Sequence, residues 1–187
     1  MTVMTAPPKT SLITGDELLT MGDIGPCELI DGRIVSMSPT GDEHAVIESN
    51  LVHELKLFVR QHKRGLVRSG EVGIYIRRWP DRIRAADVAF VSTDRLAKPV
   101  KGFLEVAPEL AVEIMSPTDR WVDIRGKLDD YFSIGVERVW IVEPERRTVL
   151  VYRSTTDFNE LDEEDILRGE GILHGFELPV SELFAEL

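Results

Sequence analysis

The chain has 187 residues, 43% hydrophobic and 29% charged, which is ordinary for one globular domain with a substantial core. Its 33 acidic and 22 basic side chains give a net charge of −11, which argues against a protein that coats nucleic acid but does not exclude a nuclease. The single cysteine, Cys27, excludes an internal disulfide framework and a cysteine-rich metal site.

The first residues, 1–11, are expected to form a flexible segment, and residues 12–187 a single domain. The beginning of the chain lacks the apolar core of a signal peptide, and no apolar run is long enough to span a membrane. Together with the absence of disulfides, these features lead us to expect a cytoplasmic protein.

The N-terminal third alternates helix and hairpin signals. A short helix is predicted over 14–20, because its first threonine and Glu17 have the spacing of a capping box. Two short apolar runs around an Asp-Gly pair predict a hairpin over 28–35. Apolar residues at helical spacing predict a long helix over 43–62, ended by Gly65.

The middle of the chain carries the strongest strand signals. Residues 72–78 alternate in polarity and predict a strand with one wetter face. Nearly continuous apolar runs at 87–92 and 109–115 predict strands covered on both faces. A helix is expected over 119–134, with Trp121 among the residues of its buried stripe.

The C-terminal part is expected to begin with a hairpin of strands 138–143 and 148–153. The acidic segment 157–165 is interpreted as a solvated loop, and the tail after it as a short strand and a terminal turn of helix. This order predicts an α/β fold with a mixed central sheet flanked by helices and carrying the site at one edge. A right-handed crossover is expected around the helix.

Two acidic residues lie within the predicted apolar strands. Asp87 begins one strand and Glu113 lies in the middle of the next. A buried carboxylate is costly unless a metal, a cation or several donors accompany it. If the strands are adjacent, the pair can hold a divalent metal, and two carboxylates without a histidine cage favour Mg²⁺ or Mn²⁺ over Zn²⁺. The alternative is that arginines or backbone donors satisfy both acids.

The predicted helices offer further polar candidates. Lys127 shares one helical face with Asp123 and Tyr131, so its ammonium can extend toward the acids, or form a surface pair with Asp123. Glu48, with His44 one turn earlier, faces partly inward on the first long helix. It is either a further metal ligand or a boundary residue whose carboxylate reaches solvent.

Basic residues cluster around 60–68 and 77–84, and a solvated surface is the simpler interpretation of both clusters. The four histidines make no paired zinc pattern, and the sequence has no nucleophile elbow and no phosphate-binding loop of the GxxxxGK type.

Several short motifs, taken in order, resemble those of one known family. They are Glu28-Leu-Ile-Asp-Gly, Ser38-Pro-Thr-Gly with His44, Ala86-Asp-Val-Ala-Phe-Val, Leu110-Ala-Val-Glu-Ile-Met-Ser-Pro, the series Asp123, Lys127 and Tyr131, Gly135-Val-Glu-Arg-Val-Trp-Ile-Val and Val149-Leu-Val-Tyr. Over residues 12–187 the chain resembles the Uma-two family, bacterial proteins assigned as endonucleases. That family is similar to the PD-(D/E)xK restriction-endonuclease-like superfamily.

The resemblance implies roles for matching residues. Asp87 matches the family's first metal-binding acid and Glu113 the acid of the next strand. The superfamily's lysine two residues later is replaced by Met115, and Lys127 matches a lysine that the family carries on the following helix. Glu48 matches an additional acid of the first helix. Ala86 replaces the family's proline before the aspartate, which concerns backbone entry rather than chemistry.

The resemblance therefore implies a Mg²⁺- or Mn²⁺-dependent endonuclease that hydrolyses phosphodiester bonds, with DNA as the expected substrate, and that acts as a homodimer. Asp87, Glu113 and Glu48 would bind metal, Lys127 would stabilise charge, and His44, Asp123 and Tyr131 would support them. Two alternatives remain: a non-catalytic nucleic-acid-binding or regulatory module, and a structural homodimer subunit on the same fold.

Overall fold

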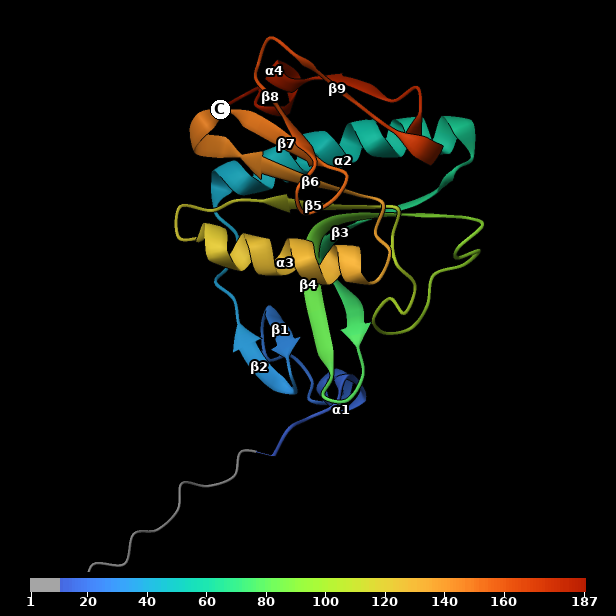
Figure 1. The fold of residues 1–187 in the computed structure, drawn as a ribbon, viewed down its shortest axis with the longest axis vertical. Helices are drawn as coiled ribbons and strands as arrows, with labels where there is room; N and C mark the ends of the chain where they lie inside the picture. Colours follow the sequence, from blue (N-terminus) through green and yellow to red (C-terminus); the bar gives the residue numbers. More distant parts are fainter. Residues whose placement is uncertain (1–10) are drawn as a thin grey trace, which may run out of the picture.

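The structure is a computed structural model that describes residues 11–187 (Figure 1). The predicted flexible segment, residues 1–11, lies outside the described residues except for Ser11. Within the described part of the chain, no helix combines the length and the apolar character needed to cross a bilayer.

The helices are α1 (Gly15–Thr20), α2 (Asp42–His62), α3 (Trp121–Ser133) and α4 (Val180–Leu183), with 3₁₀ turns at Pro144–Arg146 and Gly171–Leu173. The strands are β1 (Cys27–Ile30), β2 (Arg33–Ser36), β3 (Gly65–Arg77), β4 (Arg82–Ser92), β5 (Leu110–Ile114), β6 (Arg138–Glu143), β7 (Thr148–Tyr152), β8 (Phe158–Leu161), β9 (Ile166–Arg168) and β10 (Glu177–Pro179).

Strands β1 to β8 form one mixed sheet. Neighbouring strands follow the order β2-β1-β4-β5-β6-β7-β8, and β3 pairs with β4 outside this path. Strands β5 and β6 are parallel, and α3 provides the crossover that parallel pairing requires. The other pairs of this sheet are antiparallel. A separate pair, β9 and β10, follows.

The two long helices cover opposite faces of the sheet (Figure 1). Helix α2 buries residues four apart, Ile47, Leu51, Leu55 and Val59, in one core cluster with the side chains of β4 to β7 that face it. The elements after β8 contribute to the same cluster through residues such as Phe176 and Phe184. Helix α3 buries Ile124, Leu128 and Tyr131 in the other cluster. The observed layers confirm the predicted α/β fold with a mixed sheet and flanking helices.

A smaller lobe lies at one end of the molecule, where β4 extends beyond the helix layers toward α1, β1 and β2 (Figure 1). Its core contains Leu18, Leu29 and Ile83. The capping box predicted for α1 is present, with the Thr14 side chain bonded to the backbone of Glu17 and the Glu17 side chain bonded back.

Three predicted boundaries are wrong for identifiable reasons. Helix α2 is capped by Lys63 in the left-handed region (φ 52°), and Gly65 instead begins β3. A Cβ at Gly65 would lie 2.3 Å from the carbonyl oxygen of Val91, so close strand pairing explains this glycine. Strand β3 thus starts before residue 72, and β4 starts at Arg82 rather than Asp87.

Two further expectations are corrected. The acidic segment 157–165 contains β8, which pairs with β7 although most of its residues are exposed. The site is not at an edge of the sheet, because β4 and β5 are interior strands. The many acidic side chains of segment 157–165 hid the signal of β8. The place of the site could not be predicted, because the position of a strand within a sheet is not a local property of sequence.

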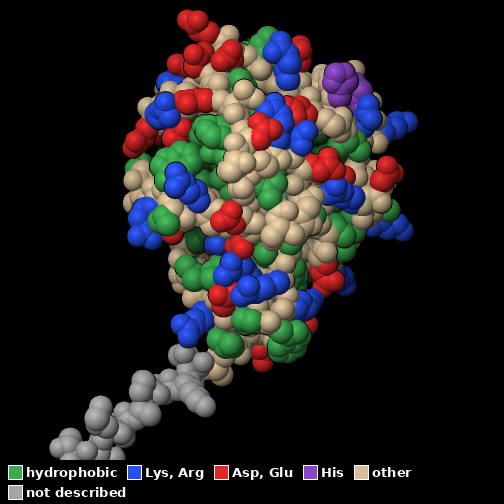
Figure 2. All heavy atoms as spheres, viewed as in Figure 1, with side chains coloured by type: hydrophobic (Ala, Val, Ile, Leu, Met, Phe, Trp, Pro, Cys, Tyr) green, Lys and Arg blue, Asp and Glu red, His purple; other side chains and the backbone are tan. Residues whose placement is uncertain are grey.

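The basic cluster at 77–84 is not simply a solvated surface. Arg82 bonds Asp31 and Asp130, Arg84 bonds Glu28 and Asp130, and Arg78 pairs with Glu105. On the face shown in Figure 2, blue and red side chains alternate and no continuous basic surface is visible.

Candidate active site

The candidate site lies where the sheet opens beside β4. Strand β3 pairs along one edge of β4, and two strands share the other edge: Leu29 of β1 pairs with Ile83, and β5 pairs with residues 88–90. Between them, side chains satisfy the backbone of Ala85. Its N–H donates to Glu28 Oε1 (3.1 Å) and its carbonyl accepts from Lys127 Nζ (3.2 Å). Because buried backbone groups need partners, this opening holds polar side chains within an apolar layer.

Asp87 lies at the opening and is 7% exposed. Its Oδ2 accepts a hydrogen bond from the backbone N–H of Ile114 (2.6 Å), just beyond the residues of β5 that pair with β4. Its Oδ1 lies 3.3 Å from Nε2 of His44 on α2. The contact lacks hydrogen-bond geometry, so within residues 11–187 the buried Nε2 has no hydrogen-bond partner.

Glu113 faces α3 from the next strand and is 4% exposed. Its Oε2 accepts from Lys127 Nζ (2.5 Å) and its Oε1 from the hydroxyl of Tyr131 (2.5 Å). Burial raises the pKa of Glu113 to about 8, against the opposing effect of Lys127 and with a further contribution from the charge of Asp87. The buried environment thus disfavours the ionised form of Glu113.

Lys127 is held by three oxygens from different elements. Besides Glu113 and the Ala85 carbonyl, Oε1 of Glu28 lies 3.6 Å from Nζ. Burial opposes the ammonium, but Glu113 and Glu28 outweigh it and raise the pKa of Lys127 above its usual value. Lys127 therefore remains positively charged at neutral pH. It does not form the alternative surface pair with Asp123.

An ion-pair network behind Lys127 fixes Glu28. The Oε2 atom of Glu28 accepts from Arg84 (2.7 Å), and Arg84 also donates to Asp130 (2.7 Å). Glu28, which is 5% exposed, was not among the predicted site residues. Its place in a half-buried strand was a usable signal, because a carboxylate in an apolar strand needs a cation or several donors, as was argued for Glu113.

A second group of acids lines the α2 side. Glu48 Oε1 accepts from the backbone N–H of Gly70 (3.0 Å), and burial together with Asp87 raises the pKa of Glu48. Glu71 lies at a bulge of β3 with φ 57°, and burial and Asp87 raise its pKa as well. Glu71 was not among the predicted site residues, although Gly70 inside a strand pattern indicates a bulge.

Solvent reaches this side through an open hollow of about 500 Å³ along α2. Its lining residues are Ala45, Glu48, Ser49, Val52, His53, Lys56 and Ser69. Glu48 therefore borders this hollow, and its pKa responds to the charge of Asp87.

The structure brings most predicted site residues together. Asp87 contacts His44, Glu113 contacts Lys127 and Tyr131, and the charges of Glu48 and Asp87 influence each other. Asp123 lies apart, because it is exposed and bonded to Arg120 (2.9 Å). The expectation that Asp123 positions Lys127 is therefore not supported by the geometry.

The residues at the opening fit a divalent cation in their chemistry. Asp87 Oδ1 receives no hydrogen bond from the described residues, and the charge of Asp87 raises the pKa of Glu48, Glu71 and Glu113. A cation would relieve this concentration of carboxylates, and their oxygens are the hard ligands that Mg²⁺ prefers. Within residues 11–187, however, no three Asp, Glu, His or Cys side chains already form a metal shell.

Comparisons with known proteins agree with this fold. A crystal structure titled as a putative nuclease belonging to DUF820, from Anabaena variabilis ATCC 29413, is similar with a TM-score of 0.78 and 21% sequence identity, covering 92% of this chain and 98% of that one. No curated protein matches the chain. The family model Uma2, described as "Putative restriction endonuclease", matches residues 16–181. The chain thus belongs to the Uma2 family, which is the Uma-two family that its motifs resemble.

Proposed function

We propose that this chain is a Mg²⁺-dependent endonuclease that hydrolyses phosphodiester bonds in DNA. The observation that carries the proposal is the convergence of Asp87, Glu113 and Lys127 at the opening beside β4, between β1 and β5. Membership of a family described as "Putative restriction endonuclease" supports a nuclease acting on nucleic acid.

Asp87 and Glu113 would hold the metal, with Glu48 as a further acid at the solvent side. When bound, Mg²⁺ (or Mn²⁺) would supply a Lewis acid for the phosphate and a water of lowered pKa. Asp87 is suited to this role because its Oδ2 is fixed by the backbone of β5, while its Oδ1 accepts no hydrogen bond from the described residues and lies 3.3 Å from His44 Nε2.

Lys127 would stabilise the negative charge that develops on the phosphate oxygens. Its ammonium is fixed by Glu113, Ala85 and Glu28, so little reorganisation is needed during the reaction. Tyr131 holds the second oxygen of Glu113 and so fixes the orientation of that carboxylate. The two acids and the lysine are thus assembled before substrate arrives.

A plasmid assay tests the proposal. Supercoiled DNA incubated with the purified chain and Mg²⁺ should be nicked or cut, and EDTA should stop the reaction. Asp87→Asn should remove the activity, whereas Asp94→Asn, an exposed residue after the end of β4, should retain it. Equal cleavage by the wild type and Asp87→Asn would overturn the proposal.

A second candidate is a nucleic-acid-binding or regulatory module without catalysis. It is favoured by the lack of a preformed three-ligand metal group within residues 11–187 and by protein donors that occupy both oxygens of Glu113. A Mg²⁺ titration separates the two candidates. An enzyme requires the ion for turnover at the acids, whereas binding by such a module would be the same in Mg²⁺ and EDTA.

A further inference from the structure

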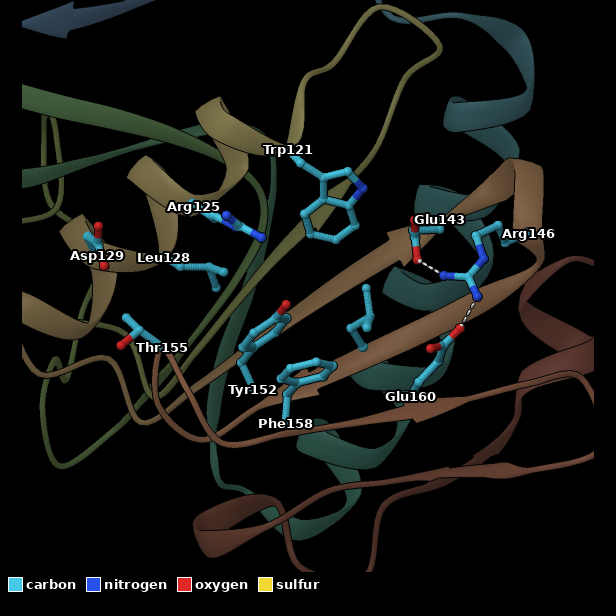
Figure 3. A pocket seen from close by; sticks show the side chains of 11 residues that line it. Trp121, Arg125, Leu128, Asp129, Glu143, Arg146, Tyr152, Thr155, Phe158 and Glu160 are labelled. Atoms are coloured by element: carbon cyan, nitrogen blue, oxygen red, sulfur yellow. Dashed lines mark hydrogen bonds and ion pairs between the residues drawn. The ribbon is translucent and has the colours of Figure 1, made fainter.

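A hollow of about 520 Å³ lies between α3 and strands β6 to β8 (Figure 3). It is lined by Trp121, Arg125, Leu128, Asp129, Glu143, Arg146, Leu150, Tyr152, Thr155, Phe158 and Glu160, and we call it the α3–β7 pocket. In Figure 2, hydrophobic side chains edged by charged ones gather on the left of this face, around α3 and the neighbouring strands. The volume is in the range of small-ligand sites.

Aromatic rings dominate one part of the α3–β7 pocket. Tyr152 and Phe158 stack with ring centroids 4.7 Å apart and planes inclined by 24°. Trp121, which the sequence placed in the buried stripe of α3, is 38% exposed, and Phe158 is 46% exposed. Large aromatic side chains left open around a hollow provide stacking surfaces for another planar group.

Polar groups point into the same space. Tyr152 is 6% exposed, yet its hydroxyl faces the hollow toward Trp121 and Arg125 (Figure 3) and makes no hydrogen bond within residues 11–187. Arg125, which is exposed, also lines the hollow and extends toward Trp121 (Figure 3). Glu143 and Glu160 both contact Arg146. The pocket therefore offers a donor, a cation and carboxylate acceptors around its rings.

We propose that the α3–β7 pocket binds an unstacked nucleobase of the nucleic-acid substrate. This inference rests on the proposed nuclease function. A base would stack on Trp121 or Phe158, while the Tyr152 hydroxyl and Arg125 bond its ring nitrogens or carbonyls. The carboxylates can accept from exocyclic amino groups, as acids do from cytosine N4.

The position of the α3–β7 pocket favours a base over an unrelated ligand. In the sheet register, Glu113 of β5 is followed by Ile141, then Leu150 and then Glu160. Leu150 is thus two strands from the site, about 10 Å at ordinary strand spacing. Helix α3 carries Lys127 beside the acids and Arg125 beside the pocket. A nucleic-acid strand cleaved at Asp87 could therefore place one of its neighbouring bases in the α3–β7 pocket.

The experiment uses an Asp87→Asn background, which should bind without cutting, and short single-stranded DNA carrying one 2-aminopurine, whose fluorescence is quenched on stacking. Affinity is measured by anisotropy, with a matched oligonucleotide that has an abasic residue at the same position. We expect quenching in the Asp87→Asn background. Adding Trp121→Ala should reduce the quenching and lower affinity by about 5- to 150-fold, which corresponds to stacking one base on an aromatic side chain.

Control variants make the result specific. Trp121→Phe should preserve quenching, and Trp79→Ala, at a turn where the tryptophan is 80% exposed, should change nothing. With the abasic oligonucleotide, Trp121→Ala should have no further effect on affinity. Phe158→Ala provides a second truncation in the pocket and should also weaken quenching.

Two failures are distinguishable. If the oligonucleotide binds but quenching and affinity are the same with and without Trp121 and Phe158, the base pocket is wrong while the proposed nuclease function stands. If no variant binds single-stranded or double-stranded DNA or RNA, both proposals are overturned together.

Discussion

Glu113 at the candidate active site and Glu170, which binds Arg138 at the start of β6, both accept hydrogen bonds from cationic side chains, but their pKa values shift in opposite directions. Glu170 is bound by Arg153 and Arg138, and these arginines lower its pKa against the opposing effect of burial. Glu113 is almost fully buried, and burial raises its pKa to about 8 despite Lys127. The arginines around Glu170 stabilise its ionised carboxylate near the surface, whereas burial at the candidate site disfavours the ionised form of Glu113.

Contact with a cationic side chain therefore does not by itself identify the role of an acid. At Glu170, two guanidinium groups satisfy one carboxylate, which leaves no reason to expect a ligand. At the opening beside β4, several acids share few cations, and Asp87 raises the pKa of its acidic neighbours. Binding of a cation would stabilise such a site, because it would offset the repulsion between the acids.

The largest effect is expected from Asp87→Asn. The substitution keeps the shape of the side chain but removes the charge of Oδ1, so DNA cleavage in Mg²⁺ should fall on the order of 10³-fold. Thermal denaturation in EDTA should show no loss of stability beyond about 1 kcal/mol, because concentrated negative charge is relieved. Retained cleavage with the metal dependence unchanged would contradict the assignment.

Lys127→Met should reduce kcat by about 10²-fold, since a fixed charge beside the phosphate is lost. It should also destabilise the protein by about 1 to 3 kcal/mol, because a buried oxygen of Glu113 and the carbonyl of Ala85 lose their donor. Adding Glu113→Gln should recover no activity. Urea denaturation and single-turnover cleavage measure the two effects, with the exposed Lys101→Met as control.

Glu28→Gln should have a smaller effect of about 10-fold on kcat, the lower end for residues that orient a catalytic group. The amide oxygen can still accept from Ala85 N–H, while the electrostatic restraint on Lys127 is weakened. KM should stay the same, because Glu28 is buried behind Lys127. A rise in KM with unchanged kcat would show that Glu28 does not act through Lys127.

The smallest effect is expected from Glu170→Gln, about 1 kcal/mol of stability at neutral pH and none on cleavage. Because the folded pKa of Glu170 lies below the ordinary 4.5, its stabilisation is present above that value and is lost as the pH falls through the lowered pKa. The difference in urea stability between the wild type and Glu170→Gln should therefore disappear in acid.

Glu113→Gln should show the opposite trend in EDTA. The folded wild type retains a proton between pH 4.5 and about 8 that the unfolded chain releases, so its stability decreases as the pH rises through that range. The stability of Glu113→Gln relative to the wild type should thus increase from acidic to neutral pH. If the stability relative to the wild type changed in the same direction with pH for Glu113→Gln and Glu170→Gln, the proposed difference between the two acids would be wrong.

The central parts of the site were predictable from sequence because their signals are local. Asp87 and Glu113 stand out within apolar strands, and Lys127 and Tyr131 share one helical face. Their family motifs added an expected role for each. The contact between Lys127 and Glu113 then follows from the crossover of α3 over parallel β5 and β6.

The residues that sequence reasoning missed depend on contacts between distant segments. Glu28 reaches Lys127 only because β1 and β5 share one edge of β4, and its partner Arg84 is 56 positions further along the chain. Glu71 turns toward the site through a bulge whose geometry follows from pairing with β4. Trp121 has the spacing of a core residue, yet the hollow beside β7 leaves it open.

The most direct test of the central claim is a crystal of the wild-type chain soaked in Mn²⁺, examined by anomalous difference density. The account predicts a peak in contact with Asp87 and Glu113 that is lost in Asp87→Asn. Soaked crystals with no peak there, from protein that still cuts DNA in Mn²⁺, would contradict the assignment of these acids as the metal centre.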